Sequence, residues 1–257
     1  MSTLDLRVRY FQDSTPIEVP CREENFIRRE ITMPLPVEQT AFVLVDVWNV
    51  HFIESWIERA RDVTVNAIVP ALNAAREAGL TIVHAPCPEV AGQFPQLNRH
   101  TPPEILPPSD WPPPEFQSRT GEYTAYRGPR SQPPSIGIHW DSLADKLGMS
   151  PAIEVQDDDF VIATGEQLHK LAKECGILHL LYVGFATNWC VVGRDYGIRA
   201  MTRRGYNIVL LRDATTGVEF PDTLEQLFTT EITIREVEQQ CGFTASNEAF
   251  FAACRAV

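Results

Sequence analysis

The sequence predicts an α/β protein with a doubly wound, three-layer fold around a mainly parallel six-stranded sheet. Two observations lead to this prediction. Short, continuously apolar runs rich in β-branched residues are typical of strands that are covered on both faces. Helical stretches separate these runs, so consecutive strands are expected to be parallel and joined by right-handed crossovers. At 257 residues, 44% of them hydrophobic, the chain can bury one full core. We interpret residues 1–257 as a single domain.

An N-terminal arm, residues 1–40, precedes the predicted core. Leu4, Leu6, Val8 and Tyr10 alternate with polar residues. This alternation predicts an edge strand or a hairpin.

The core elements then follow in order. The apolar runs predict strands at residues 41–46, 80–85, 159–163, 178–184 and 206–213, with a short one near 242–244. The stretches between them predict helices at about residues 54–78, 166–175, 188–204 and 222–239, and a last helix from residue 247. Glycines at positions 79, 176 and 205 are expected to end the first three helices.

A proline-rich insert, residues 86–157, interrupts this alternation. Residues 86–135 hold 13 of the 20 prolines, and no helical or strand period survives there. The insert also carries several aromatic residues, which favour an ordered loop over a disordered linker. A loop of this length is usually functional. We therefore expect a lid or an oligomer contact, and a homo-oligomer because a monomer would leave these aromatics partly exposed.

Composition limits the classes of partner. The net charge of −12 argues against nucleic-acid binding, which needs clustered Lys and Arg. No apolar run approaches the roughly 20 residues that span a membrane, and the charged N-terminus does not resemble a signal peptide. A cytoplasmic protein acting on a small molecule is expected. The six cysteines lack metal-site spacing and are expected to be free thiols.

Two reactive side chains are predicted at the ends of strands. Asp46 closes the first core strand, and Cys190 lies in the first turn of the helix that follows strand 178–184. Ligands bind parallel sheets at this edge, and the two strands are neighbours in the order 3-2-1-4-5-6. A helix N-terminus is expected to lower the pKa of the thiol and to offer N–H groups to an oxyanion. Taken singly, each residue also has an ordinary role, Asp46 as a turn residue and Cys190 in packing.

The segments around these residues resemble the isochorismatase-like cysteine hydrolases, a family that includes nicotinamidase and N-carbamoylsarcosine amidase. The likeness covers about residues 40–216 apart from the insert. It rests on Val45-Asp46 with Trp48-Asn49, on Gly184-Phe-Ala-Thr187-Asn-Trp-Cys190-Val191, and on Gly205-Tyr206 with Asp213-Ala214. The resemblance implies that Cys190 attacks a carbonyl to form a thioester while Asp46 carries the proton. It also implies a cis peptide between Phe185 and Ala186.

The family's third catalytic residue is a lysine near the end of the strand before the nucleophile strand. Here Asp159-Phe-Val-Ile leads to Ala163 and Thr164, and no lysine stands at that place. We predict that His84 replaces it, with Arg127 or Arg130 of the insert as alternatives. His84 could equally be a core histidine bonded to the backbone.

The remaining predictions concern the pocket and the reaction. Substrate contacts are expected from Trp48, His51, Phe185, Ala186, Thr187, Trp189 and Arg127. The family's metal-binding pattern is missing from Ala85-Pro-Cys-Pro-Glu89, so neither a metal nor another cofactor is expected. The leading function is hydrolysis of a small amide, ureide or carbamoyl C–N bond. The alternatives are an isochorismatase-like vinyl-ether hydrolase, which needs no thiol, and a non-catalytic binding or assembly protein.

Overall fold

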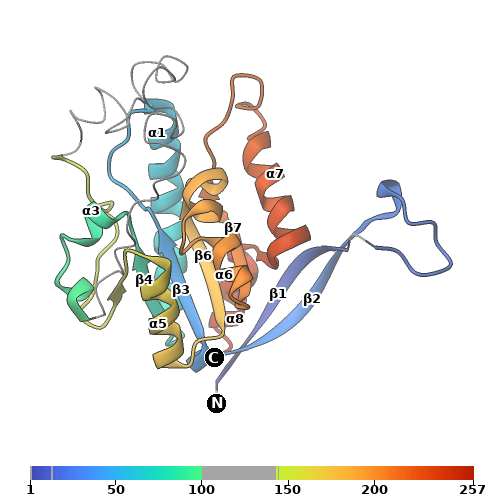
Figure 1. Ribbon diagram of the computed structural model, residues 1–257, viewed down its shortest axis with the longest axis horizontal. Coiled ribbons are helices and arrows are strands. Elements are labelled where there is room, and N and C mark those ends of the chain that lie inside the picture. The colour runs from blue at the N-terminus through green and yellow to red at the C-terminus, as the bar shows by residue number, and fades with distance from the viewer. Residues whose placement is uncertain (1, 13, 100–142, 144) are drawn as a thin grey trace, which may run out of the picture.

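The computed structural model describes residues 2–12, 14–99, 143 and 145–257. Its centre is an eight-stranded sheet with the order β2-β1-β8-β7-β6-β3-β4-β5 (Figure 1). The strands are β1 (Thr3–Gln12), β2 (Ile27–Pro36), β3 (Thr40–Val45), β4 (Thr81–Ala85), β5 (Phe160–Val161), β6 (His179–Phe185), β7 (Asn207–Thr216) and β8 (Phe243–Ala245). The α/β class is confirmed.

The expected count of six strands is wrong. Six strands, β3 to β8, are parallel to one another and follow the predicted order. The N-terminal arm adds β1 and β2 as an antiparallel hairpin, and β1 pairs with β8 through Arg9 and Thr244. The alternating apolar residues Leu4, Leu6 and Val8 are buried there. The arm joins the sheet because these side chains cover part of the hydrophobic core.

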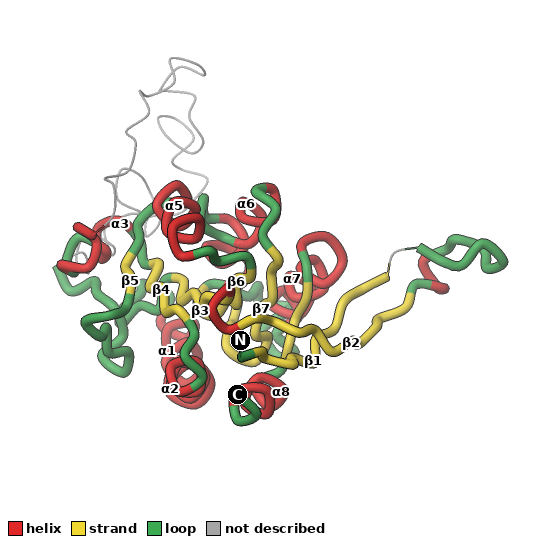
Figure 2. The backbone as a smooth tube through the Cα atoms, turned by 90° about the horizontal axis from the view of Figure 1, so that it is seen from below, coloured by secondary structure: helices red, strands yellow, loops and turns green. Residues whose placement is uncertain are grey.

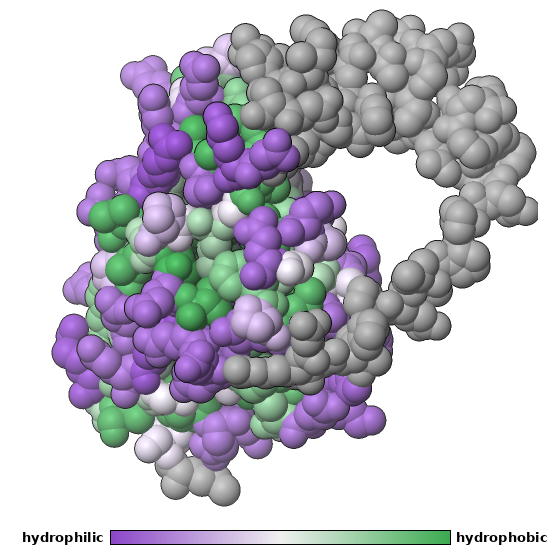
Figure 3. All heavy atoms as spheres, turned by 90° about the vertical axis from the view of Figure 1, so that its left-hand side faces the viewer, coloured by the Kyte–Doolittle hydropathy of each residue, from purple (hydrophilic) through white to green (hydrophobic). Residues whose placement is uncertain are grey.

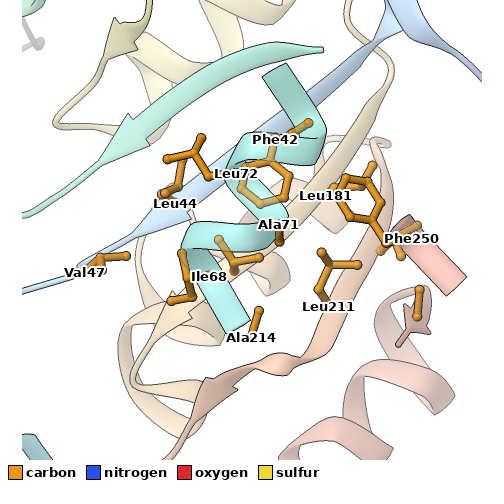
Figure 4. Packing of buried hydrophobic residues seen from close by; sticks show 14 of the residues in the cluster. Phe42, Leu44, Val47, Ile68, Ala71, Leu72, Leu181, Leu211, Ala214 and Phe250 are labelled. Carbon is orange, nitrogen blue, oxygen red and sulfur yellow. The ribbon is translucent and has the colours of Figure 1, made fainter. Parts of the chain in front are cut away.

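Helices cover both faces of the sheet (Figure 2). One face carries α1 (Glu54–Val63), η3 (Thr64–Ile68), α2 (Val69–Glu77) and α8 (Asn247–Cys254). The other face carries α5 (Gly165–Cys175), α6 (Ile198–Arg203), α7 (Phe228–Glu236) and η9 (Val237–Cys241). Each layer encloses its own apolar cluster. In the cluster under α2, Phe42 and Leu181 of the sheet lie near Leu72 and Phe250 of the helices (Figure 4).

Two helices differ from the sequence prediction. The stretch expected at 188–204 is divided into η8 (Thr187–Val191) and α6. Between them the chain leaves the helix to bury Tyr196 and to let the Asp195 carboxylate accept a hydrogen bond from Gly165 N at 2.7 Å. The helix expected from about residue 222 begins only at Phe228, because Leu227 before it is left-handed with φ +51°.

The ends of the insert pack against the segment that follows β3. They include α3 (Pro88–Ala91), η4 (Pro95–Arg99) and the chain after residue 145. Asn49 donates to Lys146 O at 2.9 Å and accepts from Gly148 N at 2.9 Å. Figure 3 shows this side of the molecule, where hydrophobic residues gather near the middle among hydrophilic ones. The middle of the insert, with Arg127 and Arg130, lies outside the described residues.

Two further observations concern the chain as a whole. Of the helices that the structure describes, none is long and apolar enough to cross a bilayer. All six cysteines are free, as the sequence predicts.

Candidate active site

Asp46 and Cys190 come together because β3 and β6 are neighbours. Val45, the last residue of β3, lies opposite Gly184 of β6, so the segments that follow both strands emerge at one edge of the sheet. Gly184 has φ +115°, and a Cβ there would lie 2.0 Å from Val45 O. Only glycine permits this close approach of the two strands. The predicted neighbourhood of the two strands is confirmed.

The turn after β6 is fixed by its own backbone and by β7. The peptide between Phe185 and Ala186 is cis, as expected. Ala186 O accepts hydrogen bonds from Trp189 N at 3.0 Å and from Val191 N at 3.2 Å. Thr187, which was expected to contact substrate, is fully buried, and its hydroxyl lies 2.7 Å from that of Thr215. Thr187 therefore ties the nucleophile turn to β7.

Asp46 is a buried carboxyl group next to a cation. The residue is 1% exposed, and its backbone is left-handed with φ +43°. Oδ2 accepts hydrogen bonds from Arg194 Nε at 3.2 Å and from Arg194 Nη2 at 3.1 Å. The Cys190 thiol and the backbone of Cys87 also interact with the carboxyl group. Burial raises the pKa of Asp46, and Arg194 and the hydrogen bonds oppose that rise.

The Cys190 thiol is largely buried beside this carboxyl group. Burial and the charge of Asp46 raise its pKa well above the ordinary value, and Arg194 works in the opposite direction. The predicted fall in the thiol pKa is therefore wrong. The turn η8 that holds Cys190 has only five residues, too few to build the dipole of a regular helix. Forming a thiolate therefore requires a base that takes the thiol proton, and the Asp46 carboxyl group is the acid–base group that interacts with the thiol.

Arg194, rather than His84, is the cation at Asp46. His84 is fully buried, and its Nε2 lies 2.8 Å from Asp159 Oδ2. Arg76 of α2 donates to the same oxygen at 2.6 Å. The expectation that His84 faces Asp46 is thus corrected, because its ring is turned toward α2 and Asp159. Sequence reasoning missed Arg194, although its place four residues after Cys190 on a predicted helix was an available signal.

An aromatic cluster lies near the nucleophile turn and gathers four of the predicted pocket residues. The His51 ring centroid is 5.8 Å from that of Trp48 and 6.4 Å from that of Trp189. Trp56, which was not predicted, lies 4.6 Å from His51 and 6.0 Å from Phe185. Burial lowers the pKa of His51 to about 4, so the imidazole is neutral near pH 7. Ile53 N donates to His51 Nδ1 at 3.1 Å and orients the ring.

Residues 143–238 match the family described as the Isochorismatase domain. The chain has an isochorismatase-like α/β fold. It resembles a cysteine hydrolase from Pseudomonas syringae pv. phaseolicola with a TM-score of 0.56 and 15% identity, over 88% of this chain and 97% of that one.

Two further solved structures share this fold. An isochorismatase family protein from Desulfovibrio vulgaris has a TM-score of 0.51 and 14% identity, over 84% of this chain and 98% of that one. One from Burkholderia thailandensis has a TM-score of 0.50 and 19% identity, over 85% and 96% respectively. No curated protein sequence matches the chain. At these identities the structures establish the fold alone.

The candidate site is braced from the far side of the turn that carries Cys190. The Asn188 amide donates to Val218 O and accepts from Val218 N, both at 3.0 Å. Arg59 of α1 donates to Thr216 Oγ1 and to Gly217 O, both at 2.9 Å. These bonds fix the end of β7 against the turn that carries Cys190, so this turn has a rigid support.

Within the described ranges, no three His, Cys, Asp or Glu side chains lie close enough together to hold a metal ion. The polar groups next to Asp46 are a thiol and a guanidinium. This set is suited to moving a proton between sulfur and carboxylate.

Proposed function

We propose that the protein is a cysteine-dependent hydrolase of a small amide, ureide or carbamoyl C–N bond. The observation that carries the proposal is the contact between the Cys190 thiol and the buried Asp46 carboxyl group. A thiol with a raised pKa is a weak nucleophile by itself. A carboxylate with a raised pKa is a competent base for it, because the two affinities for the proton are then closer together.

The proposed reaction has two halves. In the first, Cys190 Sγ attacks the substrate carbonyl carbon while Asp46 takes the thiol proton. The C–N bond then breaks, and Asp46 gives that proton to the leaving nitrogen, which leaves a thioester on Cys190. In the second half, Asp46 takes a proton from water as the water oxygen attacks the thioester. Sulfur leaves and recovers the proton, and a carboxylic or carbamic acid is released.

The aromatic cluster supports the binding of a small, planar, uncharged substrate. The rings of Trp48, His51 and Trp189 offer flat apolar surfaces, and the His51 imidazole is uncharged at neutral pH. Trp189 is 45% exposed, so part of this surface is open to an incoming molecule. A cavity of about 290 Å³ that includes His51 and Phe52 in its wall adjoins the cluster.

A screen of uncharged amides, ureides and carbamoyl compounds tests the proposal. We expect ammonia or amine release by the native chain and a loss of at least about a thousandfold in both Cys190→Ala and Asp46→Asn. Cys254→Ala, which changes a thiol on α8, is the matched control and should retain the rate. Quenched mixtures should contain a mass adduct on Cys190. Turnover that persists in Cys190→Ala would contradict the thioester route.

A further inference from the structure

The electrostatics of this site require a nearby cation. A carboxylate and a developing thiolate share one buried place, and each raises the pKa of the other. The resembled family meets this need with a lysine. In this chain the residues after β5 are Ile162 and Ala163, both buried and uncharged. The three lysines lie elsewhere: Lys146 is exposed, and Lys170 and Lys173 belong to α5.

Arg194 contacts the Asp46 carboxylate and belongs to the same segment of chain as Cys190. Its Nε and Nη2 both donate to Asp46 Oδ2. The other oxygen, Oδ1, is buried and has no partner of normal hydrogen-bond geometry among the residues described. The cation therefore holds one oxygen of Asp46, and the carboxyl group also interacts with the Cys190 thiol and the Cys87 backbone.

The backbone on both sides of Arg194 is fixed. Arg194 N donates to Cys190 O at 3.0 Å, which sets the guanidinium one turn beyond the thiol. Just after it, Asp195 packs on α5 so closely that a Cβ at Gly165 would lie 2.1 Å from Asp195 O. Tyr182 then donates its hydroxyl to Tyr196 O at 2.7 Å. The break in the helix is thus held by tertiary contacts, and it fixes where Arg194 leaves the chain.

We propose that Arg194 is a positioning residue that keeps Asp46 ionised and aims its free oxygen at Cys190, in place of the family's lysine. The inference rests on the proposed function for the reaction it serves. Its physical content, a charge coupled to the Asp46–Cys190 pair, does not depend on any substrate. In the described structure the titratable groups that interact with Asp46 are Cys190, Arg194, Tyr196 and Cys87.

Removing the charge of Arg194 changes how the reactivity of Cys190 depends on pH. The reactive form of the pair holds one proton between Asp46 and Cys190. With Arg194 present, that form persists to lower pH because the cation opposes the rise in the Asp46 pKa. In Arg194→Gln both groups hold a proton up to higher pH. The acid limb of Cys190 reactivity must therefore move to higher pH.

The experiment is alkylation of Cys190 by iodoacetamide, mapped by mass spectrometry, from pH 5 to pH 9 on the full chain. Near the foot of the native acid limb, we expect Arg194→Gln to react roughly tenfold more slowly, with the limb displaced upward. Arg194→Lys should keep the native limb, because the charge remains. Arg199→Gln is the matched control, since Arg199 forms a comparable ion pair with Glu236 on the surface, and it should follow the native curve.

Two results would overturn the inference. One is an Arg194→Gln curve that coincides with the native and Arg199→Gln curves. The other is an Arg194→Lys limb displaced upward like that of the Gln variant, because a positioning charge must be rescued by another charge. If Arg194→Gln fails to give a native thermal transition, Arg194→Met serves as the neutral variant with the same expected displacement of the limb.

Failure of this inference is distinguishable from failure of the proposed function. If Asp46→Asn abolishes C–N hydrolysis while Arg194→Gln keeps the native acid limb, the function stands and the role of Arg194 falls. If no C–N substrate is cleaved but the alkylation limb moves as expected, the role of Arg194 stands and the function falls. With an active substrate, Arg194→Gln should lower kcat at neutral pH more than it changes KM.

Discussion

Two buried aspartates, Asp46 and Asp159, each meet an arginine, yet their environments drive their proton affinities in opposite directions. Asp159 accepts hydrogen bonds from Arg76 Nη2 at 2.6 Å and from Gln156 N at 3.0 Å, and it lies 2.8 Å from His84 Nε2. Burial raises the pKa of Asp159, but these partners, with His84 first, bring it below the ordinary value. For Asp46, burial outweighs Arg194 and the pKa is raised.

Under the proposed function, the difference separates a structural anion from a proton carrier. Asp159 has three partners on its Oδ2, namely Arg76, His84 and Gln156, so its charge is stabilised and it joins α2 to the chain before β5. Asp46 keeps one oxygen without a strong donor, next to a thiol. A carboxylate that is held but incompletely compensated can take up and release a proton during a reaction. The presence of an arginine alone therefore does not identify the catalytic carboxylate.

The largest expected effect is on turnover. Asp46→Asn should lower kcat/KM for a C–N substrate by at least about a thousandfold, because the base is lost. Asp159→Asn should leave the kinetics of the folded fraction within a few-fold of native. Steady-state rates, normalised to folded protein by circular dichroism, provide the measurement. Equal losses in the two variants would erase the distinction between the aspartates.

The free energy of unfolding should depend more on Asp159 than on Asp46, the reverse of the effect on turnover. Asp159→Asn leaves Arg76 and His84 without their common anion, and breaking such a buried cluster costs on the order of 3 kcal/mol of unfolding free energy. His84→Gln should cost less, about 1–2 kcal/mol, since the ion pair with Arg76 remains. Urea unfolding at pH 7 measures both. A His84→Gln variant that is fully stable but inactive would return His84 to the catalytic role that the sequence suggested.

The sequence predicted the meeting of Asp46 and Cys190 because strand order and strand ends are encoded locally. Apolar runs locate the strands, and the carboxyl ends of neighbouring parallel strands share an edge. The same local patterns indicated only that Arg194 lies about one helical turn after Cys190, not that its side chain reaches Asp46. Its position depends on the break at Asp195, which contacts with Gly165 and Tyr182 impose from elsewhere in the fold.

Two other sequence predictions failed for the same reason, because they depend on tertiary packing. The pKa of Cys190 was expected to fall because its place after a strand is visible in the sequence, whereas its burial is not. His84 was assigned to Asp46 because their strands are neighbours, but strand adjacency does not say which layer of helices a side chain meets. The cluster of His84 with Asp159 and Arg76 depends on how α2 and the chain before β5 pack together, which local sequence patterns do not give.

The pH dependence of stability should have opposite signs for the two aspartates. The folded pKa of Asp159 is lowered, so its contribution is present above the unfolded value of about 3.9 and is lost as pH falls below it. The folded pKa of Asp46 is raised, so its contribution is present below the unfolded value and is lost as pH rises through the folded one. Unfolding free energies between pH 3 and pH 7 should therefore fall less on acidification in Asp159→Asn than in the native chain. They should fall more in Asp46→Asn. Parallel native and variant curves would contradict these signs.

The smallest expected effect concerns Glu219, a third carboxylate that is held by hydrogen bonds at the start of α7. It accepts from Thr229 N and Thr230 N, both at 2.9 Å, and from the Thr223 hydroxyl at 2.7 Å. Partial burial raises its pKa, but hydrogen bonds from Thr230 and Thr223 prevail and lower it to about 2. Its stabilising contribution is thus complete above the unfolded pKa of about 4.3 and is lost as pH falls toward 2.

Glu219→Gln should cost about 1 kcal/mol at pH 7, because the amide replaces one acceptor oxygen with a donor that faces other donors. The native and variant unfolding free energies should converge as pH falls from 4 to 2, where the native carboxylate takes up its proton. Urea unfolding at pH 7 and pH 2.5 measures this convergence, and Glu225→Gln, on the neighbouring turn, is the control. Because Glu219 has hydrogen-bond donors but no thiol beside it, its substitution should leave Cys190 alkylation unchanged. A slower reaction of Cys190 in Glu219→Gln would show instead that the Arg59 and Asn188 braces transmit strain from this loop to the nucleophile.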